Sequence, residues 1–156
     1  MKKFFSILAL LTVFVSTNAE IYRGSCGDNV TYTLDTETGL LAIEGTGDMW
    51  DFDNPNAVPW AEQRLDIKTV TIAEGVTSIG DVAFHLAGFL SSITIPNSIS
   101  KIGAYALYCT PISSIEIPNS VTSIGDWAFG DCLGLTSVTI PNSVTTLGEY
   151  LFGGCI

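Results

Sequence analysis

Apolar and polar positions recur with a fixed period from Val70 to the end of this 156-residue chain. Segments in which apolar residues alternate with polar ones begin at Val70, Ile93, Ile115 and Val138, so consecutive starts lie 22 or 23 residues apart. From these starts the four units begin VTIAEGVTSIGDVAF, ITIPNSISKIGAYAL, IEIPNSVTSIGDWAF and VTIPNSVTTLGEYLF. Such a period is typical of a solenoid, in which each unit buries its apolar side only against its neighbours.

The third unit shows how one repeat is expected to fold. Ile115 and Ile117 alternate with Glu116, which predicts a short parallel strand with the two isoleucines facing the core. Pro118 ends the strand because it has no N–H to donate. The chain then turns and returns apolar residues to the core, namely Val121, Ile124 and the stretch from Trp127 to Phe129.

Residues 20–69 do not repeat, and we expect them to form a cap over the first turn of the solenoid. Apolar residues alternate with threonines from Val30 to Leu34, and a second apolar stretch follows turn residues at Leu40 to Ile43. This pattern predicts a β-hairpin. Trp50 and Trp60 are expected to add bulk to the cap, and a short helix is predicted from Pro59 to Leu65.

The N-terminus has the pattern of a secretory signal peptide, residues 1–19. Lys2 and Lys3 precede an apolar run, and small or polar residues lead to a cleavage site after Ala19. No segment of the remaining chain is apolar over the roughly 20 residues that a membrane span needs. We therefore expect a secreted or cell-surface protein without a membrane span in its mature chain.

Charge excludes one class of partner. Without residues 1–19 the chain has four basic and 16 acidic residues, a formal net charge of −12. A field of this sign repels phosphate backbones, so nucleic acid is not an expected partner.

The repeat and the leader carry a family resemblance. The combination of Ile-Pro-Asn-Ser, Ala-Phe and a following cysteine resembles the treponemal-type leucine-rich repeat of BspA-like surface proteins. The segment CGDNVTYTLDTETGLLAIEGTGDMWDF, beginning at Cys26, is similar to the leader of such proteins. The resemblance implies adhesion to host matrix proteins or to other cells, outside the cell or at its surface.

The predicted fold class is therefore an α/β-type repeat solenoid. In detail we expect a right-handed leucine-rich-repeat solenoid, with short parallel strands on the concave face and the N-terminal β-hairpin cap. Residues 70–156 would form the four units, the last of them incomplete.

Three cysteines are expected to stack. Cys109, Cys132 and Cys155 are placed at equivalent repeat positions, with one residue missing before Cys109. Strand spacing of about 4.8 Å is wider than the Cβ separation that a disulfide prefers. A ladder of small buried thiols is the favoured interpretation, with disulfides as the alternative and Cys26 apart from the ladder.

Candidates for catalysis or metal binding are few, and we expect no enzyme, cofactor or metal. His85 is the only histidine, and no Gly-x-Ser-x-Gly elbow is present. A cluster of carboxylates matches only part of the spacing of a calcium loop, because Pro55 and Asn56 break it. A paired-carboxylate glycosidase is the enzyme alternative. The carboxylates of the cluster are Asp48, Asp51, Asp53 and Glu62.

The outward residues of the predicted strands form the candidate binding surface, which is small, polar and charged only at Glu116. Solenoids commonly use such an extended face for recognition. The expected partner is a protein or glycoprotein such as host extracellular matrix, and a merely solvated face is the alternative. The surface consists of Thr71, Ser92, Thr94, Ser114, Glu116, Ser137 and Thr139.

A structural, self-assembling subunit is the second functional hypothesis. The last unit stops at Ile156 before a full repeat, and we expect Tyr150, Leu151 and Phe152 to promote self-association through an uncapped end.

Overall fold

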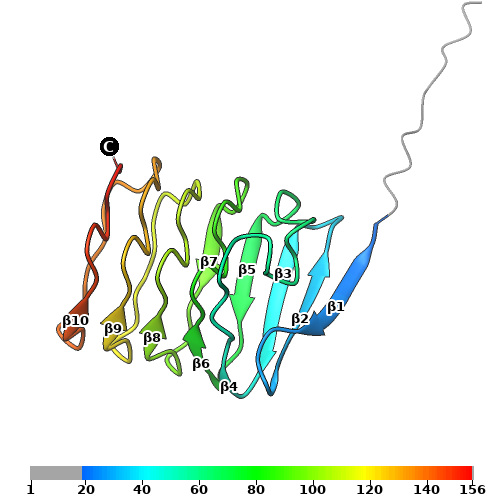
Figure 1. Ribbon diagram of the computed structural model, residues 1–156, viewed down its shortest axis with the longest axis horizontal. Helices are drawn as coiled ribbons and strands as arrows, with labels where there is room; N and C mark the ends of the chain where they lie inside the picture. Colours follow the sequence, from blue (N-terminus) through cyan, green and yellow to red (C-terminus); the bar gives the residue numbers. More distant parts are fainter. Residues whose placement is uncertain (1–18, 156) are drawn as a thin grey trace, which may run out of the picture.

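A computed structural model describes residues 19–155 of the chain (Figure 1). These residues form ten short strands in two sheets, with turns between them and no helix. The expected signal peptide lies outside the described residues apart from Ala19. The strands are β1 (Ile21–Ser25), β2 (Val30–Asp35), β3 (Leu40–Gly45), β4 (Gly47–Asp48), β5 (Thr69–Ile72), β6 (Val76–Ile79), β7 (Ser92–Thr94), β8 (Lys101–Ile102), β9 (Ser123–Ile124) and β10 (Thr146–Leu147).

The first sheet joins the N-terminal segment to the repeats. Its order is β1-β2-β3-β5-β7, with antiparallel pairing through β3 and parallel pairing from there on. The β2–β3 hairpin confirms the prediction from the alternation in residues 30–43. Its apolar positions are fully buried at Leu34, Leu41 and Ile43, because alternate residues of a strand share one face.

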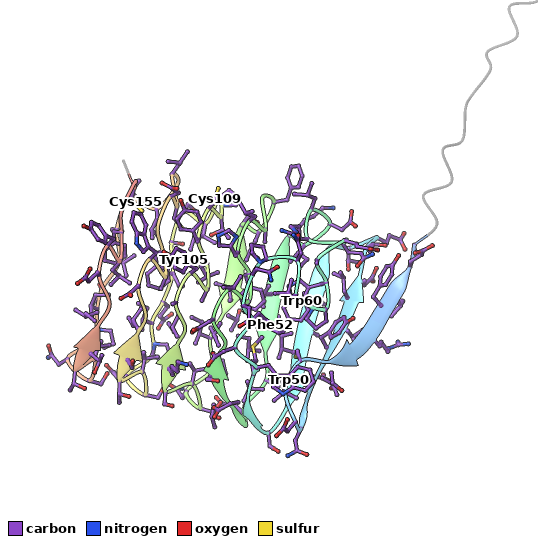
Figure 2. The ribbon with its side chains drawn as sticks, viewed as in Figure 1. Trp50, Phe52, Trp60, Tyr105, Cys109 and Cys155 are labelled. Atoms are coloured by element: carbon purple, nitrogen blue, oxygen red, sulfur yellow. The ribbon has the colours of Figure 1, made fainter. Side chains whose placement is uncertain are left out.

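Trp60 packs the N-terminal segment against the first repeat. Its ring is 1% exposed, stacks on Phe84 at 5.8 Å between centroids and meets the edge of Tyr32 at 5.2 Å. The indole Nε1 donates to the carbonyl of Ala83 at 3.0 Å, so its polar atom is satisfied inside the core. Trp50 instead is 43% exposed (Figure 2).

The helix predicted from Pro59 to Leu65 is wrong, and so is the α/β label. The segment is a series of turns in which the N–H groups of Ala61, Gln63 and Asp66 each donate to a carbonyl three residues earlier. A helix this short gains few main-chain bonds for the cost of its nucleus. The side chain of Arg64 takes up further acceptors, the carbonyls of Ala61 and Pro55.

The parallel ladder through all the repeats is not the predicted one. It is the second sheet, β10-β9-β8-β6-β4. Its strands within the repeats, β6, β8, β9 and β10, occupy the stretch that we expected only to return to the core. The predicted strands pair at β5 and β7 alone, and residues 115–117 and 138–140 form no strand. Pairing on this side weakens from the second unit on, where Pro96, Pro118 and Pro141 replace Ala73, whose N–H donates to the carbonyl of Ile43.

A third set of contacts joins the units through stacked turns. The N–H groups of Val82, Phe84 and Leu86 donate to the carbonyls of the next unit at 2.8, 2.8 and 3.0 Å. The two following pairs of units repeat this pattern, with donors Tyr105, Leu107, Cys109, Trp127, Phe129 and Asp131. These bonds fix the register of neighbouring units, and they bury Phe84, Leu107 and Phe129 one behind the other.

That register corrects the cysteine alignment. Cys109 is exposed and equivalent to Asp131, while Thr110 occupies the position of Cys132 in the second unit. Thr110 Oγ1 lies 3.4 Å from Cys132 Sγ, and both are buried. The residue that the second unit omits therefore follows Thr110, between it and Ile115, rather than preceding Cys109.

Replacing Phe129 with alanine is expected to destabilise the fold strongly. Its ring has no exposed surface and stacks on Phe152 at 5.7 Å. Truncating such a side chain costs about 3 to 5 kcal/mol, and we expect the melting temperature to fall by roughly 10 °C. Thermal unfolding followed by circular dichroism measures the change. Phe89, which is 60% exposed, is the control: Phe89→Ala should stay within about 0.5 kcal/mol of the parent. Equal effects of the two substitutions would contradict the assigned core.

Thiol labelling tests the corrected register. Cys109 should react with iodoacetamide in the folded protein, because it is exposed. Cys26 and Cys132 should be protected, since burial raises the pKa of Cys26 to about 12 and also raises that of Cys132. Mass spectrometry after native labelling measures this, with labelling in guanidinium as the control in which every cysteine reacts. A native rate at Cys132 equal to that at Cys109 would contradict the arrangement.

Candidate binding surface

The structure exposes all seven residues of the predicted binding surface. Thr71 and Thr94 are direct neighbours in the β5–β7 register, with Ser92 at the start of β7. The remaining four follow in the next two units as Ser114, Glu116, Ser137 and Thr139. The residues that alternate with them, from Val70 to Ile140, are buried or half-buried, so inward and outward positions follow the sequence pattern.

Beyond β7 the neighbouring main-chain stretches of this face are no longer hydrogen bonded to one another. No main-chain hydrogen bond joins residues 92–95 to 114–117, or 114–117 to 137–140, within the described chain. Two depressions lie there, of about 330 Å³ between the second and third units and about 610 Å³ between the third and fourth. Glu116 and Asn119 line both of them. The predicted surface is therefore hollowed between units rather than flat.

Three asparagines that were not predicted also belong to this surface. Asn97, Asn119 and Asn142 line the depressions beside Thr94, Glu116 and Thr139. The Pro-Asn-Ser triplet follows the predicted strand stretch in three units, and its recurrence at one offset is a signal for a shared surface role. Each amide adds donors and an acceptor to the hydroxyls and carboxylate already expected there.

The corners of the units explain where the face opens. Ser98 Oγ donates to the carbonyl of Val76 at 2.6 Å and accepts from the N–H of Gly75 at 3.2 Å, which joins the first unit to the second. At the same position in the next two units, Ser120 and Ser143, the buried Oγ has no partner within the described chain. The depressions thus lie where these bonds between units end.

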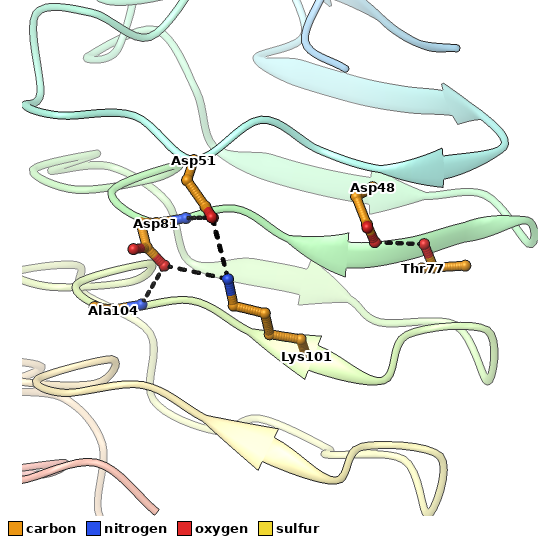
Figure 3. A network of polar contacts seen from close by, with 6 residues as sticks. All are labelled: Asp48, Asp51, Thr77, Asp81, Lys101 and Ala104. Carbon is orange, nitrogen blue, oxygen red and sulfur yellow. Dashed lines mark hydrogen bonds and ion pairs between the residues drawn. The ribbon is translucent and has the colours of Figure 1, made fainter. Parts of the chain in front are cut away.

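Two of the four carboxylates in the predicted cluster, Asp48 and Asp51, are bound within the chain (Figure 3). Asp48 accepts from Thr77 Oγ1 at 2.6 Å, and Asp51 accepts from the N–H of Asp81 at 2.9 Å. Lys101 Nζ lies 3.2 Å from Asp51 and 3.8 Å from Asp81, in exposed ion pairs of modest strength. Partial burial acts to raise the pKa of Asp51, but the Asp81 N–H and Lys101 lower it overall.

Neither the metal nor the glycosidase alternative gains support from this geometry. No group of three or more potential metal ligands lies together in residues 19–155. Of the carboxylates on which the glycosidase alternative rests, Asp48 and Asp51 are occupied by hydrogen bonds to Thr77 and Asp81. Asp48 also lines a shallow depression of about 290 Å³ with Asp28, whose carboxylate accepts from Trp50 Nε1 at 3.0 Å. His85 stacks on Tyr108 at 5.0 Å, and burial, with a contribution from Arg64, lowers its pKa. It is therefore a packed, neutral ring near pH 7.

Comparison with known proteins identifies the family. The sequence model of the BspA type leucine rich repeat region matches residues 62–156 in six copies. No curated protein gives a significant match. The described residues contain no helix that could cross a bilayer.

Solved structures show the same fold. A leucine-rich repeat protein from Eubacterium ventriosum is 25% identical with a TM-score of 0.77, over 87% of this chain and 36% of that protein. A leucine rich repeat protein of T. pallidum is 23% identical with a TM-score of 0.60, over 80% of this chain and 64% of that protein. The chain thus spans less than two thirds of either relative. The repeats, their stacked units and the matched sequence model together place this chain in the BspA-type leucine-rich repeat family.

Proposed function

We propose that this chain is an exported, non-enzymatic protein that recognises a protein or glycoprotein partner through its hydroxyl and amide face. In this proposal residues 1–19 direct export, residues 20–69 cap the first turn, and residues 70–156 present the partner surface. Adhesion at the cell surface or to extracellular matrix of a host is the corresponding role. Membership of a repeat family whose fold suits protein recognition supports this assignment.

The observation that carries the proposal is the open face between units. Hydroxyl, amide and carboxylate groups line two depressions at the point where the main chain stops bonding to itself. A partner segment lying across units 2 to 4 can supply hydrogen bonds to these groups without displacing any bond inside the chain. The short side chains of Ser114, Ser137 and Thr139 allow such a segment to approach closely.

A binding screen with matched variants tests this function. The purified protein is tested by surface plasmon resonance against matrix proteins and mucins, and each hit is repeated with Thr94→Lys, Glu116→Lys and Thr139→Lys combined. We expect binding to weaken at least about tenfold, or about 1.4 kcal/mol, because three bulky cations fill the depressions. Circular dichroism should be unchanged, since all three side chains are exposed.

The control carries the same change in charge on other surfaces. Glu37→Lys, Thr122→Lys and Thr145→Lys alter exposed residues in the hairpin turn and beside β9 and β10. This control should bind within about twofold of the parent, a difference below about 0.5 kcal/mol. Full binding by a folded Thr94/Glu116/Thr139 variant would reject the assigned face. Light scattering of the same samples separates the self-assembling alternative, which predicts a mass that rises with concentration.

A further inference from the structure

Aromatic side chains form a continuous row on the stacked turns, apart from the hydroxyl face. Trp127 stacks between Tyr150, at 5.0 Å, and Tyr105, at 6.4 Å between ring centroids. Tyr108 meets the edge of Trp127 at 6.0 Å and stacks on His85 at 5.0 Å. We call these five residues the aromatic stripe, and Tyr105 marks it in Figure 2. The row runs across all four units.

The main chain does not favour aromatic residues at these positions. Tyr105, Trp127 and Tyr150 have φ angles of 53°, 54° and 53°, in the left-handed region. Glycine and asparagine suit that region, whereas a bulky side chain there is an outlier. Three units nevertheless place a large ring at this position. The conformation of the turn therefore does not explain why aromatic residues occupy these positions, and we look for the reason in the contacts of the rings.

Two glycines leave room for the central ring. A Cβ atom at Gly130 would lie 2.7 Å from Trp127 Cε3 and 2.9 Å from Tyr108 Cδ2, and one at Gly153 would lie 2.6 Å from Trp127 Cζ3. Any side chain at either position would displace the indole. The stripe is thus held in one arrangement, while 37% of Tyr105 and 64% of Tyr150 remain exposed. Rigid aromatic residues that are partly in solvent are the kind enriched in protein interfaces.

Negative charge predominates beside the part of the stripe that lies in the second to fourth units. Residues 102–155 contain four carboxylates and no lysine, arginine or histidine. Asp126 precedes Trp127 in the chain, Glu149 precedes Tyr150, and Asp131 accepts a hydrogen bond from the hydroxyl of Tyr108. Asp126 Oδ1 also accepts from the N–H of Glu149 at 2.7 Å, which fixes its carboxylate between the third and fourth units.

We propose that the aromatic stripe binds an arginine-bearing, cationic segment of a partner protein. A guanidinium is planar, so it can lie against a ring of Tyr105 or Tyr150 while its N–H groups pair with the carboxylate of Asp126 or Glu149. The ammonium of lysine is a compact point charge that stacks less well. The site is separate from the hydroxyl face, and it selects a partner by charge as well as by apolar contact.

Oligoarginine and oligolysine peptides of equal length, each with a fluorescent label, test the proposal by anisotropy with the purified protein. We expect oligoarginine to bind several-fold more tightly than oligolysine. The variant Tyr105→Asn/Tyr150→Asn removes two rings and supplies a residue that suits a positive φ. It should bind oligoarginine at least about tenfold more weakly, or about 1.4 kcal/mol.

A second variant keeps the rings and removes the charges. Asp126→Asn/Glu149→Gln should also weaken binding by about tenfold or more. Its matched control, Glu37→Gln/Glu44→Gln, removes the same charge from exposed residues of the N-terminal hairpin and should change the affinity less than about twofold. Circular dichroism confirms that each variant is folded, and the charge variant decides the question if the asparagine variant unfolds. Equal losses in the charge variant and its control, or full binding by the folded asparagine variant, would overturn the proposal.

Discussion

Main-chain hydrogen bonds between consecutive turns are the constraint on which the remaining structure depends. They join the same atoms in every pair of units, from Val82 and Ala104 to Asp131 and Gly153. Because each bond fixes which residue lies behind which, the columns of side chains follow from it. Phe84, Leu107 and Phe129 succeed one another in the core. The aromatic stripe and the Thr110–Cys132 contact are set by the same register.

The same constraint distributes function around each unit. In the second sheet and the stacked turns, the main-chain N–H and C=O groups bond to neighbouring units. A partner on either surface would therefore meet mainly side chains. On the hydroxyl face the main chain past β7 is not paired within the described residues, and polar side chains gather beside it. One unit therefore offers two different chemistries to its surroundings. Hydroxyl and amide groups with the single carboxylate of Glu116 lie on one side, and the aromatic stripe lies on another.

Features of the fold that follow from a periodic pattern of apolar residues could be predicted from the sequence. Alternation placed the hairpin of β2 and β3 and the inward and outward sides of Thr71 to Thr139. It did not predict β8, β9 or β10, because two residues carry no measurable period and their pairing is set by the neighbouring unit. The misplaced Cys109 has a related cause. Three cysteines near the ends of units suggested that all three stack on one another. Thr110, however, follows Gly103 by as many residues as Cys132 follows Gly125, so Thr110 is the equivalent of Cys132.

The candidate site was predicted in its side chains but not in its shape. Exposed serines and threonines are visible in an alternating pattern, and Glu116 is the obvious charge among them. The depressions lie where bonds between units stop: Ser98 has partners in the preceding unit, whereas Ser120 and Ser143 have none within the described chain. The stripe was likewise hidden, since Tyr105 and Tyr108 become neighbours of Trp127 only after the units stack.

The missing main-chain bonds on the hydroxyl face also have a mechanical consequence. Main-chain hydrogen bonds join units 2 to 4 along the second sheet and along the stacked turns, but not along the hydroxyl face. Bending that widens the hydroxyl face breaks no hydrogen bond between units, whereas bending that spreads the second sheet or the turns breaks several at each step. The solenoid is therefore compliant in one direction and stiff in the others, and its softest motion changes the width of the surface that we assign to partner recognition.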